Sequence, residues 1–325
     1  MLVLDEIHVS AANLMSQVFV KVKYKLILGL TATFERLDGK HVLIEKYCPI
    51  IDKVSTLEAI ANGWISTFKE YQVLIDVDNI DEYKKLNKEW TQHFEFFQFD
   101  FNKAMSMAGP EGWKSKLTYR DELYKGNDET KKKETLQNIN YHSAGFMRTM
   151  TKRKSFINNH PKKIEIAKKI MEARPDAKII TFSNNVQMAE SLENGKYVYT
   201  GKTSKKRASD MIEKYLSGKI NHLHSCKKLI EGFNDPNTSV AIILGMDSSE
   251  RRSIQTRGRV IRFVEGKQAE VFNIVINDTQ ELKWFKDSHK TSSYISIDEN
   301  GLDKVLRGEQ PDPIKQKPRE LMFRF

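Results

Sequence analysis

Short apolar runs that alternate with helical stretches constrain the fold of this chain more than any other feature. Near the start, two such runs, "MLVLDE" and "KLILGLTAT", end in polar residues, and "SAANLMSQVFVKV" between them has helical spacing. A further run, "EYQVLIDV" at residues 70–77, reads as another strand. Buried parallel strands look like this because helices cover both faces of their sheet. The alternation predicts an α/β fold whose sites lie at the carboxyl ends of parallel strands.

The same alternation returns after residue 160 and continues to about residue 285. The predicted strands there are "AKIITFS", "KYVYT", "SVAIIL" and "AEVFNIVI". The predicted helices are "KIEIAKKIMEA", "NVQMAESLE" and "KRASDMIEKYLSG". We therefore expect a first α/β unit over residues 1–78, a helical insert over 79–159, a second α/β domain over 160–290 and a loosely attached tail over 291–325.

The predicted insert carries two features with more than one interpretation. Trp90, Phe94, Phe97 and Phe101 fall near one helical face, where they form either a base-stacking platform or an ordinary helical core, and the core is favoured. The basic run "RTMTKRKSF" at residues 148–156 is either a nucleic-acid contact or a solvated helix face.

Composition narrows the class of partner and the compartment. The 325 residues carry a formal net charge of +10, which makes an anionic partner such as nucleic acid plausible. The two cysteines, Cys48 and Cys226, lie far apart without the spacing of metal ligands. This argues against a disulfide framework or a zinc site and fits a reducing compartment. With no long apolar segment and no signal peptide, we expect a cytoplasmic protein of a bacterium or of a phage-infected host.

Two strand ends in the first unit carry side chains suited to phosphate chemistry. Asp5 and Glu6 follow the first apolar run, and Thr31 and Thr33 follow the second. A carboxylate pair at the end of a buried strand can hold Mg²⁺ beside phosphates and orient a water molecule. Hydroxyl groups at the neighbouring strand end could link the state of a nucleotide to an adjacent domain.

A third stretch, "SIQTRGRVIRF", combines Gln255, Gly258, Arg259 and Arg262. A helix that begins near Gly258 would place the two arginines one turn apart on one face. Two guanidinium groups so placed suit the phosphate oxygens of a transition state. The alternative is a solvated basic helix.

Five stretches together resemble the superfamily 2 DExH-box helicases. In order and spacing, "LVLDEIH", "LGLTATFERLDG", "KIITFSNN", "SCKKLIEGFNDP" and "IQTRGRVIR" are similar to that family's motifs II to VI. The similarity is strongest to the DNA-translocating branch that includes phage-encoded helicases and helicases of DNA repair and DNA replication. It implies two RecA-like domains with parallel sheets and a helical insert between them. It also implies that ATP and Mg²⁺ bind between the domains and that hydrolysis drives movement along DNA.

The resemblance also implies roles for individual residues. Asp5 and Glu6 would hold Mg²⁺ and activate the attacking water, and His8 would couple hydrolysis to the other domain. Thr31 and Thr33 would form the motif III linkage. Glu231, Gly232 and Asn234 would lie near the ribose, although the family often has Asp where Asn234 stands. Gln255, Arg259 and Arg262 would be the catalytic residues of motif VI, with the two arginines reaching the γ-phosphate. Gly258 would contact the nucleotide, and Thr256 stands at a position where arginine is common. The candidates for contact with a nucleic-acid backbone, largely without sequence preference, are Ser183, Asn184, Lys202, Thr203, Lys227 and Lys228.

The family's phosphate-binding loop, G-x-x-x-x-G-K-[ST], has no match among these residues. The nearest stretch, "GKYVYTGKTSKK", is one residue too long, reads as a strand and lies in the second domain. We therefore expect a truncated first domain, a second polypeptide that supplies the loop, and no ATP hydrolysis by this chain alone. The alternative is a nucleic-acid-binding or regulatory protein that does not hydrolyse ATP.

Overall fold

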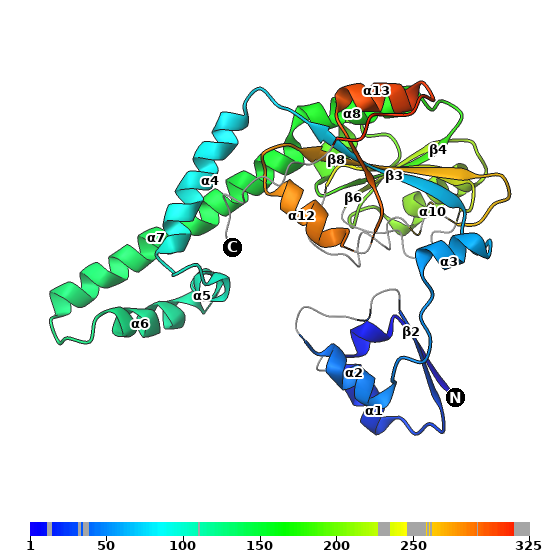
Figure 1. Ribbon diagram of the computed structural model, residues 1–325. Coiled ribbons are helices and arrows are strands. Elements are labelled where there is room, and N and C mark those ends of the chain that lie inside the picture. Colours follow the sequence, from blue (N-terminus) through cyan, green and yellow to red (C-terminus); the bar gives the residue numbers. More distant parts are fainter. Residues whose placement is uncertain are drawn as a thin grey trace.

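Every strand pairing within the two sheets of the computed structural model is parallel, which confirms the predicted α/β class (Figure 1). The structure describes residues 1–11, 15–31, 34, 39–109, 111–226, 235–245, 258, 260, 262–290 and 292–314. In these ranges no helix is both long and apolar enough to cross a membrane.

A small unit at the amino terminus holds a two-stranded sheet. Its elements are β1 (Leu2–Asp5), η1 (Ile7–Ala11), η2 (Met15–Gln17), α1 (Val18–Lys21), β2 (Ile27–Leu30) and α2 (His41–Tyr47). The register of β1 on β2 runs from Leu2 opposite Ile27 to Asp5 opposite Leu30, so both strands end at the same edge. Ile7, Phe19 and Ile44 are buried beneath the sheet.

The larger unit is built on a seven-stranded sheet with the order β5-β6-β4-β7-β8-β3-β9. Its strands are β3 (Thr67–Ile75), β4 (Lys178–Ser183), β5 (Val198–Tyr199), β6 (His222–Cys226), β7 (Thr238–Ile243), β8 (Gln268–Ile276) and β9 (Ile295–Ile297). The helix α3 (Thr56–Ala61) lies in the segment that joins the two units, and Ser55 caps it with a hydrogen bond from the backbone of Glu58.

Helices cover both faces of this sheet (Figure 1). On one face lie α8 (Pro161–Glu172), α9 (Val186–Glu190) and α13 (Glu299–Leu306), and on the other lie α10 (Lys205–Leu216) and α12 (Glu281–Ser288). Side chains alternate along each strand, so Ile242 packs under α8 while Ala241 and Ile243 pack under α10.

The structure corrects two sequence expectations about what belongs to this sheet. The strand expected in the first unit, β3, pairs along its whole length with β8, from Thr67 opposite Gln268 to Ile75 opposite Ile276. Residues 295–306, expected in a loose tail, form β9 beside β3 and α13 on the sheet, with Ile297 and Leu302 fully buried. A loosely attached tail is therefore wrong for this segment, because its apolar side chains complete the core of the sheet. The other domain boundaries stay predictions.

The predicted helical insert forms an arm that projects from the sheet (Figure 1). Its helices are α4 (Ile80–Glu95), α5 (Phe101–Ser106), α6 (Gly112–Leu123) and α7 (Glu129–Asn159). α4 packs along α7, where Gly145 permits a close approach: a Cβ atom there would lie 2.2 Å from the ring of His93. A hollow of about 520 Å³ opens between α6 and α7 on this arm.

The aromatic stripe of the insert is mostly core. Phe94 and Phe97 are buried, and the rings of Trp90 and Phe94 lie 4.8 Å apart at their centroids. Phe146 of α7 packs against Phe94 at 5.3 Å. Phe101 is the exception, with 48% of its surface exposed. The ordinary-core interpretation is therefore confirmed for the central members of the stripe.

Candidate functional site

Three predicted site residues meet at the carboxyl ends of β1 and β2. Glu6 follows the last residue of β1, Thr31 follows the last residue of β2, and His8 is buried between them. The Nδ1 atom of His8 lies 2.8 Å from Oγ1 of Thr31 and 3.2 Å from Oε2 of Glu6. One imidazole therefore joins both strand ends.

The backbone at this point holds the two carboxylates in a defined arrangement. Glu6 has a φ of +50°, a left-handed conformation that is uncommon for residues other than glycine. Its backbone N–H donates to Oδ1 of Asp5 at 2.9 Å, which orients the exposed carboxylate of Asp5. Strained backbone of this kind persists where the surroundings enforce it, often at functional sites.

The chemistry of this cluster fits Mg²⁺ bound together with phosphate. Among the residues described, no group of three or more His, Cys, Asp or Glu side chains is arranged to hold a metal ion by itself. Mg²⁺ commonly takes only one or two protein carboxylates and completes its shell with water and substrate phosphates. Asp5 and Glu6 would be those carboxylates.

Gly258 and Arg262, two residues of the predicted arginine segment (residues 258–262), lie in the larger unit. Arg262 lies beside the linker, which is the segment with α3 that joins the two units. Gly258 is helical, but the predicted helix does not extend to Arg262, whose backbone forms an antiparallel bridge with Ile65. Ser66 Oγ donates to the carbonyl of Arg262 at 3.0 Å and accepts from the N–H of Val264 at 3.0 Å. Backbone groups that a longer helix would use for its own hydrogen bonds are therefore paired with the linker instead. The remaining predicted residues of both sites lie outside the described residues: Thr33, Lys227, Lys228, Glu231, Gly232, Asn234, Gln255 and Arg259.

Two of the predicted nucleic-acid contacts lie at the end of β4, and one of them, Asn184, also contacts the arm. Ser183 is buried, and its hydroxyl donates to the carbonyl of Asn185 at 2.9 Å. Asn184 Nδ2 donates to Oδ1 of Asn158 near the end of α7 at 3.2 Å. The side chain of Ser183 is therefore enclosed in this structure. Contact of either residue with nucleic acid stays a prediction.

An exposed basic cluster surrounds the other pair of predicted contacts. Lys202 is exposed in the loop before α10, where Oγ1 of Thr203 accepts from the N–H of Thr200 at 2.9 Å. Sequence reasoning missed three exposed neighbours on the first turn of α10, namely Lys205, Lys206 and Arg207. The basic residues of the run "KTSKKR" could have indicated this cluster from the sequence alone. Cations beside a helix amino terminus form a surface that attracts phosphate.

The basic run of the arm divides into structural and exposed members. Arg153 is buried, with its guanidinium carbon 4.2 Å from the ring centroid of Trp90 and one nitrogen 3.4 Å from the hydroxyl of Tyr83. Lys152 and Lys154 on either side are exposed. The exposed Lys152 and Lys154 therefore fit the solvated helix face, whereas the buried Arg153 fits neither interpretation. Contact of this run with nucleic acid stays a prediction.

A buried ion pair lies under the carboxyl edge of the large sheet, and no pattern in the sequence predicted it. Lys163 and Glu281 are both fully buried and lie 2.5 Å apart. Lys163 also donates to the carbonyl of Leu244 at 2.9 Å, and Glu281 accepts from the N–H of Ile276 at 3.0 Å. Burial lowers the pKa of Lys163 and raises the pKa of Glu281, while each partner opposes the shift in the other. The pair fastens the starts of α8 and α12 to the ends of β7 and β8.

Comparison with known proteins relates part of the larger unit to a known family. Residues 162–264 match the helicase conserved C-terminal domain. This part of the chain is therefore similar to a helicase C-terminal domain. The chain is also 25% identical over 298 residues to "DNA 3'-5' translocase XPB2" of Sulfurisphaera tokodaii, an alignment that covers 87% of this chain and 60% of that protein. The chain thus spans about 60% of the length of that relative.

Solved helicase structures share the fold. S. cerevisiae Dbp5 bound to RNA and ADP BeF3 matches with a TM-score of 0.52 and 13% identity over 94% of this chain and 61% of that chain. A variant of Dbp5 with one substitution, in the same bound state, gives a TM-score of 0.53 at 13% identity over 94% of this chain and 62% of the other. These likenesses confirm the fold class of RecA-like helicase domains. Together with the family match over residues 162–264, they relate this chain to helicases.

Proposed function

We propose that this chain forms part of an ATP-dependent DNA translocase of the DExH type. Asp5 and Glu6 would form one wall of a nucleotide cleft, and Arg259 and Arg262 the opposite wall. The observation that carries the proposal is the meeting of Glu6, His8 and Thr31 at one edge of a parallel sheet. It occurs in a chain whose residues 162–264 match a helicase C-terminal domain. Roles in DNA repair or replication, a phage origin and a cytoplasmic location stay predictions.

Each of these residues would have its own role in ATP hydrolysis. When bound, Mg²⁺ would neutralise charge on the β- and γ-phosphates. Asp5 would hold the ion through its water shell, and Glu6 would orient the attacking water. His8, hydrogen-bonded to Thr31, would relay movement of the acidic strand end to the neighbouring strand end. The arginines would stabilise negative charge that develops on the transferred phosphoryl group.

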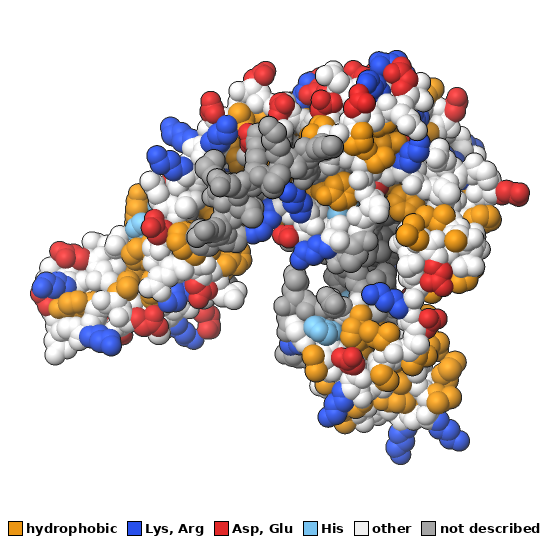
Figure 2. Space-filling view, in the orientation of Figure 1, with side chains coloured by type: hydrophobic (Ala, Val, Ile, Leu, Met, Phe, Trp, Pro, Cys, Tyr) orange, Lys and Arg blue, Asp and Glu red, His pale blue; other side chains and the backbone are white. Residues whose placement is uncertain are grey.

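The amino-terminal unit has surface suited to another protein segment. Its described sheet holds two strands, so each has one backbone edge outside this pairing. Exposed apolar side chains gather on the unit (Figure 2), with 50% of Val3, 68% of Leu26 and 50% of Leu30 exposed. Open strand edges and exposed apolar patches favour association. These features support the proposal that further polypeptide packs here and brings a phosphate-binding loop.

The test is ATP hydrolysis by the chain mixed with a polypeptide that carries a G-x-x-x-x-G-K-[ST] loop. We expect hydrolysis stimulated by DNA. It should fall about 100-fold or more in Glu6→Gln, because the water loses its activating carboxylate. It should fall about 1,000-fold in Arg259→Ala, because charge in the transition state loses its partner. Glu45→Gln, an exposed position on α2, is the matched control and should hydrolyse at the wild-type rate. Absence of hydrolysis in the wild-type mixture would contradict the proposal.

A second candidate function is nucleic-acid binding without hydrolysis. The net charge of +10 and the exposed cluster at Lys202, Lys205, Lys206 and Arg207 favour it. It predicts DNA affinity that falls steeply with salt and does not respond to ATP. Affinity measured in a salt series, with and without ATP, separates it from the first proposal.

A further inference from the structure

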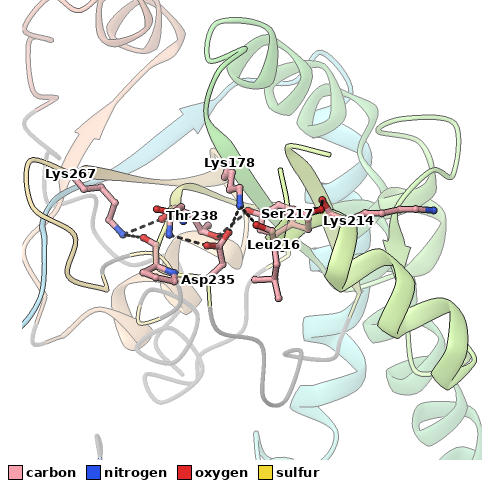
Figure 3. Close-up of polar contacts among 10 residues, drawn as sticks. Lys178, Lys214, Leu216, Ser217, Asp235, Thr238 and Lys267 are labelled. Atoms are coloured by element: carbon pink, nitrogen blue, oxygen red, sulfur yellow. Dashed lines mark hydrogen bonds and ion pairs between the residues drawn. The ribbon is translucent and has the colours of Figure 1, made fainter. Parts of the chain in front are cut away.

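Lys267 connects three backbone carbonyls that belong to two separate segments. Its Nζ donates to the carbonyl of Pro236 at 2.7 Å and to that of Val260 at 2.8 Å. It also lies 3.2 Å from the carbonyl of Thr238, to which it donates (Figure 3). A lysine ammonium has three N–H donors, so each of them is used. The turn that presents Lys267 holds Gly266 at a φ of +74° and closes with a hydrogen bond from the N–H of Lys267 to the carbonyl of Val264 at 3.1 Å.

The two segments are those that flank the predicted nucleotide contacts. Pro236 and Thr238 lie in the turn that follows residues 227–234, which hold the predicted ribose contacts. Val260 lies between Gly258 and Arg262. Its side chain is fully buried in the core under α10 and α12. Val260 is therefore held by its side chain in the core and by its backbone carbonyl, which accepts from Lys267.

Another lysine holds the same turn from the opposite side. Lys178 Nζ lies 2.9 Å from Oδ2 of the buried Asp235 and donates to the carbonyl of Leu216 at 3.1 Å (Figure 3). Asp235 in turn accepts from the N–H of Asn237 at 3.0 Å. Lys178 thus ties the turn to the end of α10, whereas Lys267 ties it to the arginine segment.

We propose that Lys267 is a positioning residue for hydrolysis, because it holds the backbone of Val260, two residues before Arg262, against the turn at residues 235–238. The proposal rests on the proposed function, since the arginines matter only if a nucleotide is hydrolysed. Three carbonyls around one nitrogen require the tetrahedral donors of an ammonium. The planar fork of an arginine cannot reproduce that arrangement.

The charged state of Lys267 gives the arrangement a pH dependence. Burial lowers the pKa of Lys267 to about 8, the guanidinium of Arg262 adds to this effect, and the carboxylate of Asp235, itself paired with Lys178, opposes it. Above that pH a growing fraction of Lys267 is a neutral amine with two donors for three carbonyls. We therefore expect hydrolysis to decline as the pH rises through about 8.

This decline should not reflect unfolding. The pKa of Lys267 in the folded chain lies below its usual 10.5, so the unfolded chain binds more protons between the two values. Stability contributed by this group therefore rises with pH across that window. Loss of hydrolysis without loss of stability is the expected signature.

The first test compares hydrogen–deuterium exchange in the full chain and in three variants, Lys267→Met, Lys267→Arg and Lys178→Met. Peptides that contain residues 258–264 should exchange about tenfold faster in both Lys267 variants, because a hydrogen bond from a charged group is lost. Lys178→Met should lower the free energy of unfolding, because Asp235 loses its partner. It should leave exchange in residues 258–264 close to that of the wild type. Equal exchange in all four proteins would overturn the proposal.

The second test measures hydrolysis in the mixture with the loop-bearing polypeptide. Lys267→Met should lower kcat about tenfold with a smaller change in KM for ATP, because the arginines act chiefly in the transition state. The alkaline decline should disappear in Lys267→Arg and persist in Lys178→Met. Wild-type kcat and an unchanged pH profile in both Lys267 variants would refute the positioning role. An inactive wild-type mixture would refute the proposed function instead, and the exchange comparison would then decide whether Lys267 fixes the segment.

Discussion

At the scale of single residues, His8 is the side chain that connects the two strand ends of the amino-terminal unit. It is buried, with 3% of its surface exposed, and its Nδ1 lies within reach of both Thr31 and Glu6. A buried polar group that loses its partner costs more than the hydrogen bond itself contributes. The geometry of the acidic cluster therefore depends on this imidazole.

A double-mutant cycle of His8→Ala and Thr31→Val tests the connection. Thr31→Val removes the hydroxyl and leaves the imidazole without that partner, so we expect a loss of about 1–2 kcal/mol in the free energy of unfolding. The coupling between the two substitutions should be about 1 kcal/mol, measured by urea unfolding. Additive losses would mean that the contact contributes nothing.

A second prediction at this scale concerns Glu193. Hydrogen bonds from His224 and His222 to its carboxylate lower the pKa of Glu193 to about 2. Because the folded pKa lies below the usual 4.5, this stability is present above pH 4.5 and is lost as the pH falls toward 2. Glu193→Gln should therefore cost about 1–2 kcal/mol at pH 7, and the difference should shrink in acid. Denaturation at a series of pH values checks this. Glu190→Gln, an exposed neighbour on α9, should change stability little at any pH.

The meeting of Glu6, His8 and Thr31 could be predicted from sequence, and the ion pairs elsewhere could not. Parallel strands of one sheet end at a common edge, so residues that follow two strands are brought together by topology alone. Lys163 and Glu281 are separated by 118 positions. Their pairing depends on how α8 and α12 pack on the sheet, which periodicity does not specify. The contacts of Lys267 with three carbonyls could not be predicted from the sequence either, because every residue has a backbone carbonyl.

At the scale of elements, the arm owes its shape to contacts between α4 and α7. Gly145 allows the two helices to approach closely, and Arg153 reaches from α7 between Trp90 and Tyr83 of α4. Periodicity predicted the helices of the arm correctly. Periodicity did not predict which sheet would take β3, because a strand buried on both faces carries the same apolar run in either sheet.

Arg153→Leu tests how far α4 and α7 depend on this contact. The substitution removes a buried guanidinium stacked on Trp90 at 4.2 Å. We expect a loss of about 2 kcal/mol in the free energy of unfolding, because cation–π contacts of desolvated groups are among the stronger ones. Lys152→Leu, exposed on the same helix, is the matched control and should change stability by less than about 0.5 kcal/mol. Thermal unfolding of both variants provides the comparison, and equal losses would contradict this account of Arg153.

At the scale of the whole molecule, two units carry the two halves of the proposed site. The carboxyl ends of β1 and β2 point toward the larger unit, on the side of its sheet covered by α10 and α12 (Figure 1). The linker contacts the backbone of Arg262 directly, through a bridge from Ile65 and through the hydroxyl of Ser66. A change in the linker would therefore move the segment that bears the arginines. Under the proposed function, this connection would couple the nucleotide cleft to domain movement.

The most direct test of the central claim is the distance between the two proposed walls. Spin labels at Val9→Cys and Glu265→Cys, both exposed positions beside the clusters, would be placed in a chain with Cys48→Ser and Cys226→Ala. Pulsed electron paramagnetic resonance would give their separation in the mixture with the loop-bearing polypeptide and DNA. On addition of ADP with beryllium fluoride, the account predicts a shift to one shorter and narrower distance distribution. An unchanged distribution would contradict it.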